Sequence, residues 1–201
     1  MDLIRRVGTE PKRLAIFAGS FNPPTRAHVA LANAALGRVD ELLFVIPRAF
    51  PHKDFHGAAL EERLEMLRRI ADAEPRFSIG IAERGLFIDI GREARVHYKS
   101  AELLFLCGRD AAERIANWDY GEPAAFSGML EEFVLLVAGR RGEYIPPPEH
   151  SHRVEAIEIH GMDDISSTEV RERIRKTEDW QALVPETIVE IVEKVYRHNA
   201  P

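Results

Sequence analysis

The sequence predicts an α/β protein in which a doubly wound parallel sheet carries helices on both faces. Short apolar runs alternate along the chain with stretches whose apolar residues recur at helical spacing. Strands that alternate with helices in this way form parallel sheets. The length of 201 residues allows one such domain over residues 1–201, with a full sheet at its centre.

The expected strands differ in how deeply they are buried. Leu42–Ile46 is apolar throughout and is followed by Pro47, which is typical of a strand buried on both faces. Val154–Ile159 alternates apolar and polar residues, which predicts a half-exposed strand at the sheet edge. The other expected strands are Leu14–Phe17, Phe77–Ile81, Leu103–Cys107 and Glu132–Ala138.

Helical patterns fill the intervals between these strands. Leu60–Ala71 carries an apolar stripe with charged residues between its members. Val29–Leu36 is also helical in pattern, and two helices close the chain, over about Ser167–Lys176 and Pro185–His198. Pro146–Pro148 marks an exposed loop rather than a domain boundary.

Composition excludes several classes of protein. The net charge of −6 argues against general nucleic-acid binding, although basic residues that converge locally could still bind a polyphosphate. Cys107 is the single cysteine, which rules out an internal disulfide and suits a reducing compartment. No apolar run approaches the roughly 18 residues that span a membrane, and the N-terminus lacks the apolar core of a signal peptide. We therefore expect a cytoplasmic protein without a membrane partner.

Ligands of such sheets bind at the carboxyl ends of strands, so the segments after the strands are the candidate sites. After Leu14–Phe17 comes a Gly- and Pro-rich turn that leads into a helix and contains Gly19, Ser20 and Phe21. Free backbone N–H groups and the helix dipole suit a phosphate here. Thr25 and His28 are three residues apart and would face one side of the first helical turn. A plain turn with a solvent-facing histidine is the alternative.

Two further strand ends carry candidate residues. Lys53 follows the expected strand Leu42–Ile46 and could reach phosphates from the side of the ligand cleft opposite the Gly- and Pro-rich turn. A position on a basic surface loop is the alternative. After the expected strand Leu103–Cys107, Gly108 allows close approach of the backbone to a ligand. Asp110 could accept hydrogen bonds from ribose hydroxyls, or act as the N-cap of a helix over Ala111–Ala116.

A second anion site is expected near the C-terminus. Ser166 and Glu169 have the spacing of a capping box at the start of a helix. Ser167, Thr168 and Arg171 add two hydroxyls and a guanidinium beside the N-terminal amides of that helix. No metal site is expected, because the histidines of the chain lack the usual ligand spacing; the four considered, which we interpret as loop residues, are His52, His56, His150 and His152.

Residues 19–28 resemble the signature of the nucleotidyltransferase superfamily, Gly-Ser-Phe-Asp/Asn-Pro-x-His/Thr-x-Gly-His. Thr25 stands where many members have the first histidine, and Ala27 replaces the usual glycine, where a methyl group could crowd the backbone. His28 keeps the second histidine. Residues 165–171 resemble the second signature, Ile-Ser-Ser-Thr-x-x-Arg, at every fixed position. The likeness extends from Leu14 to Tyr196 and is closest to nicotinate or nicotinamide mononucleotide adenylyltransferases, which are Rossmann-like.

The resemblance implies transfer of AMP from ATP to the 5′-phosphate of nicotinate mononucleotide in NAD biosynthesis, with release of pyrophosphate and with Mg²⁺ accompanying ATP. It implies that His28, Lys53 and Arg171 are catalytic and that the Trp118 indole stacks on the pyridine ring of the acceptor. A core tryptophan is the alternative for Trp118. The implied ATP- and phosphate-binding residues are Gly19, Ser20, Phe21, Thr25, Gly108, Asp110, Ser166, Ser167 and Thr168.

One departure from the family concerns the acceptor. Members that make the nicotinate dinucleotide often carry a Ser-Tyr-Thr-like segment near the pyridine ring, which is missing from Leu86–Tyr98. Main-chain amides in Phe87–Gly91, or the side chains of Arg92 or Arg95, are candidates for holding a carboxylate; a solvated helix face is the alternative for the two arginines. Two rival functions remain: transfer of an adenylyl or cytidylyl group to another phosphorylated acceptor such as phosphopantetheine, and nucleotide sensing without catalysis. A homo-oligomer is compatible with the sequence.

Overall fold

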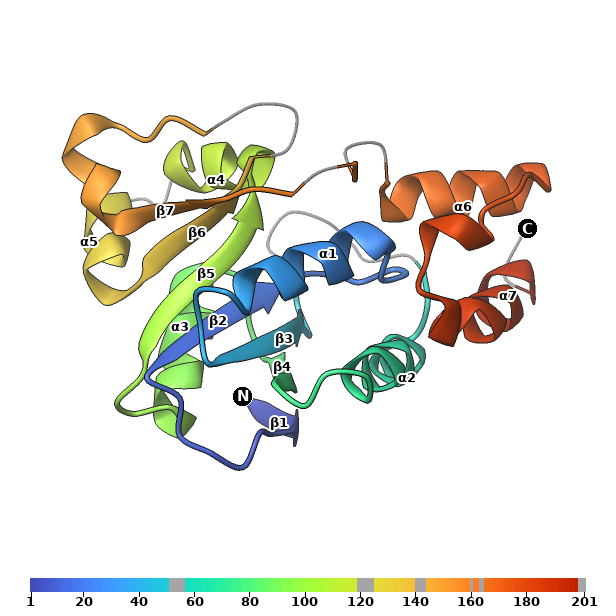
Figure 1. The fold of residues 1–201 in the computed structure, drawn as a ribbon, viewed down its shortest axis with the longest axis horizontal. Coiled ribbons are helices and arrows are strands. Elements are labelled where there is room, and N and C mark those ends of the chain that lie inside the picture. Colours follow the sequence, from blue (N-terminus) through green and yellow to red (C-terminus); the bar gives the residue numbers. More distant parts are fainter. Residues whose placement is uncertain (51–56, 119–124, 140–143, 160, 163–164, 199–201) are drawn as a thin grey trace.

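A sheet of seven strands runs through the molecule in the order β1-β4-β3-β2-β5-β6-β7 (Figure 1). The computed structural model describes residues 1–50, 57–118, 125–139, 144–159, 161–162 and 165–198. Within these residues every strand pair is parallel except β1 with β4. The strands are β1 (Asp2–Arg5), β2 (Arg13–Ala18), β3 (Glu41–Pro47), β4 (Phe77–Ala82), β5 (Glu102–Gly108), β6 (Val134–Ala138) and β7 (Val154–Ile157).

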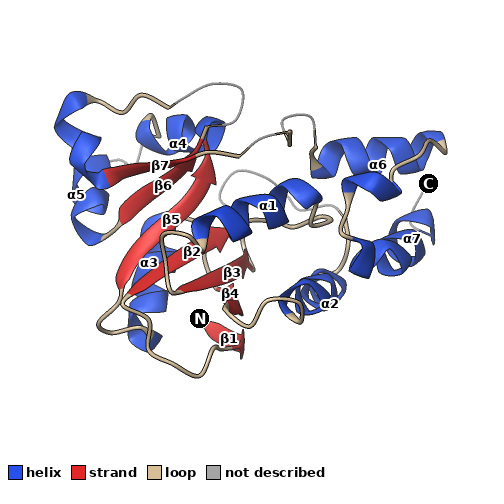
Figure 2. Cartoon of the chain, in the orientation of Figure 1, coloured by secondary structure: helices blue, strands red, loops and turns tan. Residues whose placement is uncertain are grey.

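Helices cover both faces of the sheet, as Figure 2 shows by colour. One apolar core lies between the sheet and α1, α2, α6 and α7, and a second lies between the opposite face and α3, α4 and α5. The α-helices are α1 (Arg26–Ala35), α2 (Leu60–Ala71), α3 (Phe87–His97), α4 (Arg109–Ala116), α5 (Ala125–Glu132), α6 (Ser167–Lys176) and α7 (Val189–His198). Short 3₁₀ helices span Pro148–Arg153, Gln181–Leu183 and Glu186–Ile188. None of the helices in the described ranges is both apolar and long enough to cross a membrane.

The predicted fold class is confirmed, with differences at the ends of some elements. Strand β6 begins at Val134 rather than Glu132, because Glu132 is the last residue of α5. The last helix begins at Val189, after a 3₁₀ turn that follows Pro185. Strand β1 was not expected from the sequence. It is short, pairs only with β4 at the sheet edge, and contains no buried residue, so its composition gives no strand signal.

The order of the strands positions a ligand crevice. Strand β2 lies between β3 and β5, and the chain proceeds outward from β2 in opposite directions on its two sides. In doubly wound sheets a crevice forms at this reversal, outside the carboxyl ends of the two central strands. Gly19 follows β2, and Gly108 ends β5. The fold therefore brings the first signature and the segment around Gly108 to one crevice.

A buried carboxyl group lies at the opposite, amino-terminal end of the strands. Glu41 is 1% exposed, and its Oε1 accepts hydrogen bonds from Ser78 Oγ at 2.5 Å and from Tyr98 Oη at 2.7 Å. Its Oε2 is buried and has no hydrogen-bond partner among the described residues. Burial raises the pKa of Glu41, because the charged form loses its hydration.

We expect Glu41→Gln to stabilise the protein at pH 8 relative to wild type, and to do so much less at pH 5. The pKa of Glu41 is raised in the folded state, so its contribution to stability is present below the ordinary value of about 4.5 and is lost as pH rises through the folded value. Thermal unfolding at the two pH values measures the difference. A stability gap that does not depend on pH would contradict the argument.

Candidate active site

The first helical turn of α1 fixes the orientation of His28. Thr25 is the N-cap: its Oγ1 accepts a hydrogen bond from the His28 N–H at 3.4 Å, and His28 Nδ1 accepts one from the Thr25 N–H at 3.0 Å. The second of these bonds makes Nδ1 an acceptor, so the neutral imidazole carries its proton on Nε2. The reciprocal cap therefore orients His28 as a donor through Nε2.

The structure shows a contact of Thr25 that the sequence did not predict. This side chain is fully buried, and its Oγ1 lies 2.7 Å from His28 Nδ1. Its hydroxyl is enclosed between the helix start and the imidazole, and a contact with the β- and γ-phosphates of ATP remains a prediction. Thr25 is a positioning residue for His28. Ala27, which replaces the usual glycine, is 3% exposed and packs inside the protein.

The turn between β2 and α1 is held by an aromatic anchor. Phe21 has φ of 45°, is 1% exposed, and packs edge-on against Phe17 and Phe44 with ring centroids 5.4 and 5.5 Å apart. A Cβ at Gly19 would lie 3.3 Å from the Phe21 ring, so this position favours glycine. The N–H groups of Ser20 and Phe21 donate to no residue in the described part of the chain. Such amides suit an anion, and phosphate binding by Ser20 and Phe21 remains a prediction.

The second signature forms the start of α6. Ser166 is its N-cap, and Ser166 Oγ accepts a hydrogen bond from the Glu169 N–H at 3.1 Å. The Glu169 side chain accepts from Arg173 Nε at 2.6 Å instead of returning to the cap. Only half of the expected capping box is therefore present, and the acid stabilises α6 through an i,i+4 ion pair.

The two signatures bind each other directly. Ser167 Oγ donates to the Pro23 carbonyl at 2.7 Å, a contact between residues 144 positions apart. Arg171 Nη1 donates to the Asn22 carbonyl at 2.5 Å, and its Nη2 donates to Thr168 Oγ1 at 3.3 Å. Ser167 and Arg171 therefore hold the first signature against α6. Their contacts with phosphate remain a prediction. Thr168 is exposed beside them.

Two buried side chains that the sequence interpretation did not assign support this junction. Arg63, on α2, donates to the Ser20 carbonyl at 3.0 Å, and burial lowers its pKa. Tyr196, on α7, donates to Asn22 Oδ1 at 2.5 Å, and burial raises its pKa. Arg63 and Tyr196 each stand on the buried face of an amphipathic helix. In sequence alone, such an amphipathic side chain is equally compatible with a position whose polar end reaches solvent.

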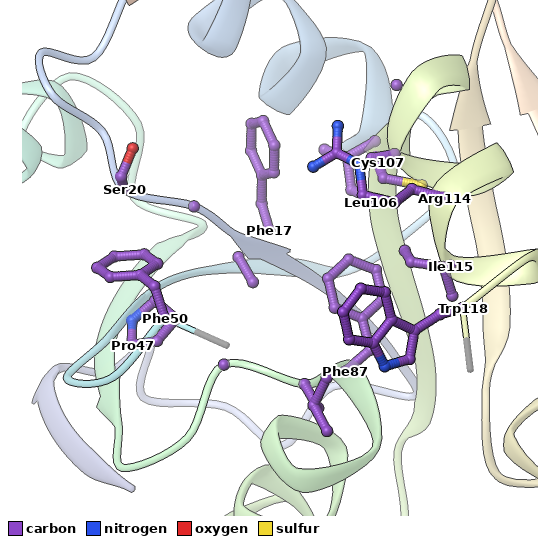
Figure 3. A pocket seen from close by; sticks show the side chains of 16 residues that line it. Phe17, Ser20, Pro47, Phe50, Phe87, Leu106, Cys107, Arg114, Ile115 and Trp118 are labelled. Atoms are coloured by element: carbon purple, nitrogen blue, oxygen red, sulfur yellow. The ribbon is translucent and has the colours of Figure 1, made fainter. Parts of the chain in front are cut away.

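A cavity of about 340 Å³ opens beside the signatures, at the carboxyl ends of β2 and β5 (Figure 3). Trp118 lines it and is 38% exposed, so the alternative of a core tryptophan is wrong. In Figure 3 its indole lies next to Phe87 at one end of the cavity, with Ser20 at the other. The cavity is lined by Phe17, Ala18, Gly19, Ser20, Pro47, Phe50, Gly85, Leu86, Phe87, Leu106, Cys107, Gly108, Ala111, Arg114, Ile115 and Trp118.

Helix α3 begins at the wall of this cavity. Its N-cap, Leu86, offers no side-chain hydrogen bond, so the first amides of α3 are not capped by a side chain. The Phe87 ring stacks on Phe105 at 4.4 Å. The two arginines considered for a carboxylate do not line the cavity: Arg92 pairs with Glu132 at 2.9 Å, and Arg95 donates to backbone carbonyls beyond the helix end. The two arginines stabilise α3, and the main-chain amides of Phe87–Gly91 remain the candidates for binding a carboxylate.

Helix α4 corrects one further expectation. It begins at Arg109, with Gly108 as its N-cap, so Asp110 lies within the first turn rather than at the cap. The Asp110 side chain is 85% exposed, and its Oδ1 lies 3.9 Å from Arg109 Nε. Gly108 lines the cavity and Asp110 does not. A contact between Asp110 and a ribose remains a prediction.

The remaining candidate residues from the sequence are only partly described by the structure. Lys53, His52 and His56 lie outside the described residues. His150 contacts Ser127 Oγ at 3.3 Å, and His152 is exposed. In the ranges that the structure describes, no three His, Cys, Asp or Glu side chains gather in a way that would hold a metal ion.

The cytidylyltransferase-like family model matches residues 16–173, which include both signatures and the cavity. The chain belongs to the cytidylyltransferase-like family. A relative from Thermus thermophilus, named "Probable nicotinate-nucleotide adenylyltransferase", is 32% identical over 90% of this chain and 97% of its own length. One of the same name from Gloeobacter violaceus is 29% identical over 94% of this chain and 98% of its own. The resemblance to nucleotidyltransferases is thereby confirmed, and the chain is a nucleotidyltransferase.

Solved structures show the same fold. The nicotinic acid mononucleotide adenylyltransferase of Plasmodium falciparum, in its complex with NaAD, aligns with a TM-score of 0.71 at 20% identity. The alignment covers 94% of this chain and 98% of that one. This neighbour supports the Rossmann-like arrangement of the sheet.

Proposed function

We propose that this nucleotidyltransferase transfers AMP from ATP to the 5′-phosphate of nicotinate mononucleotide, giving the dinucleotide and pyrophosphate. The observation that carries the proposal is the shared position of His28 and the Trp118 cavity. The His28 ring lies 5.9 Å from the Phe17 ring, and Phe17 lines the cavity. A flat ring in that cavity would extend its phosphate toward the start of α1. The relatives from Thermus and Gloeobacter carry the corresponding name.

The reaction needs positioning more than covalent chemistry. An acceptor phosphate oxygen attacks the α-phosphorus of ATP in line, a new P–O bond forms, and the bond to the bridging oxygen breaks as pyrophosphate leaves. His28 donates its Nε2 proton in a hydrogen bond to the α-phosphate as charge develops there. The Ser20 and Phe21 amides bind a phosphate at the same helix start.

The start of α6 holds the other phosphates of ATP. Thr168 is exposed there, and the guanidinium of Arg171 is fixed by Asn22 with its planar fork beside the helix amides. Lys53 remains a candidate for neutralising the acceptor phosphate. Mg²⁺ would neutralise phosphate charge, held by ATP and water, because the described residues offer no carboxylate cage. The protein would act in the cytoplasm, with ATP and the phosphorylated acceptor as its partners.

We expect Trp118→Ala to raise KM for nicotinate mononucleotide about tenfold, because stacking of a ring on an aromatic side chain contributes about 1–3 kcal/mol. KM for ATP should change little. Trp118→Phe, which keeps an aromatic face, is the matched control and should recover most of the affinity. If Trp118→Ala leaves KM for the mononucleotide unchanged, the pyridine ring does not stack on Trp118 in this cavity.

The test of the proposed function is a panel of acceptors. The protein is incubated with ATP, Mg²⁺ and one of nicotinate mononucleotide, nicotinamide mononucleotide, phosphopantetheine or a sugar phosphate, and the product is identified by its mass. The proposal predicts the nicotinate dinucleotide as the main product. Adenylylation of phosphopantetheine or the sugar phosphate alone would support the rival acceptor class.

A further inference from the structure

Arg114 is the one charged side chain among the described residues that line the cavity. It shares a face of α4 with Ala111 and Ile115, one turn before Trp118. Figure 3 shows its guanidinium extending over the cavity toward Phe17, whereas the indole of Trp118 lies at the other end. The rest of the described lining is apolar, apart from backbone groups and three side-chain groups: the Ser20 hydroxyl, the Cys107 thiol and the indole N–H of Trp118.

The guanidinium of Arg114 has no protein partner in the described part of the chain. No hydrogen bond, ion pair or ring contact joins it to another described residue. Its neighbour Arg109, by contrast, lies 3.3 Å from the Glu113 carboxylate. A planar cation that overhangs an apolar cavity, with N–H donors that bond to none of the described residues, is suited to an oxyanion on the ligand.

We infer that Arg114 binds the 5′-phosphate of the acceptor mononucleotide, an assignment that rests on the proposed function. A ring stacked on Trp118 occupies the far end of the cavity, and the attacking phosphate must lie between that ring and the start of α1. The Arg114 guanidinium extends over this interval. Its fork can bind two phosphate oxygens and offset their repulsion from the phosphates of ATP.

The ring carboxylate of nicotinate is a second oxyanion that a guanidinium could bind, so the experiment separates the two groups. Equilibrium binding is measured calorimetrically, without ATP, for nicotinate mononucleotide, nicotinamide mononucleotide and nicotinate riboside. Wild type is compared with Arg114→Gln and Arg114→Lys. Arg69→Gln is the control, because Arg69 lies on α2, pairs with Glu65 at 3.0 Å and does not line the cavity.

Arg114→Gln should weaken both mononucleotides by about 10- to 100-fold, the effect of losing charge-assisted hydrogen bonds, and leave riboside binding unchanged. Arg114→Lys should be intermediate, and Arg69→Gln should bind as wild type. A loss confined to nicotinate mononucleotide would assign the guanidinium to the carboxylate and overturn the inference. The inference is also overturned if Arg114→Gln binds each mononucleotide as tightly as wild type does.

Failure of this inference differs from failure of the proposed function. If wild type forms the dinucleotide while Arg114→Gln binds both mononucleotides normally, only the role of Arg114 is wrong. If wild type binds ATP but neither mononucleotide, the proposed function and the inference are both wrong. Circular dichroism and thermal unfolding of each variant show whether the fold is intact.

Discussion

Replacing His28 by alanine is expected to lower kcat roughly 10²–10³-fold, while the affinity for ATP changes much less. The reciprocal hydrogen bonds with Thr25 hold the imidazole with its proton on Nε2. That donor gains strength as negative charge grows on the α-phosphate, so its loss affects the transition state more than the ground state. Steady-state kinetics with ATP and nicotinate mononucleotide, together with ATP binding at equilibrium, separate the two effects.

The control for this variant is His152→Ala. His152 is exposed and lies near the start of β7, away from both signatures. The His152→Ala variant should keep the wild-type kcat. If His28→Ala also keeps the wild-type kcat, the imidazole does not act on the α-phosphate and the assignment is lost.

Arg171→Lys is expected to raise KM for ATP by about tenfold or more, although the charge is conserved. The guanidinium of Arg171 spans from the Asn22 carbonyl to Thr168 Oγ1, and so connects the first signature to α6. A lysine ammonium is a point charge that cannot make both contacts in the plane of one fork. The measurement is KM for ATP at saturating acceptor, with thermal unfolding to confirm the fold.

Arg173→Lys is the matched control, since Arg173 lies on the same helix and pairs with Glu169 away from the first signature. Its KM for ATP should stay within about twofold of wild type, because one exposed ion pair contributes little. If Arg171→Lys keeps the wild-type KM with an intact fold, Arg171 has no role in binding ATP.

The sequence predicted those elements whose pattern is local and regular. Helix α2 and helix α6 have the predicted ends, because an amphipathic stripe and a serine cap define them. The apolar run of β3 was also found, since a strand buried on both faces needs apolar residues at every position. Strand β1 was missed because an exposed edge strand imposes no such requirement.

The sequence located the site but not its internal contacts. It placed Thr25 and His28 on one turn, yet a pattern cannot tell whether the threonine hydroxyl contacts a ligand or the histidine beside it. The bonds from Ser167 and Arg171 to the first signature depend on how α6 lies against the turn that precedes α1. The open position of Arg114 depends on which face of α4 lines the cavity. Such long-range packing is not encoded in the spacing of any single motif.

The central claim is tested most directly by pyrophosphate release with ATP, Mg²⁺ and nicotinate mononucleotide. We predict one pyrophosphate for each dinucleotide formed, and no release when the acceptor is omitted. A protein that binds both nucleotides and releases no pyrophosphate would be a sensor rather than an adenylyltransferase, and would contradict the account.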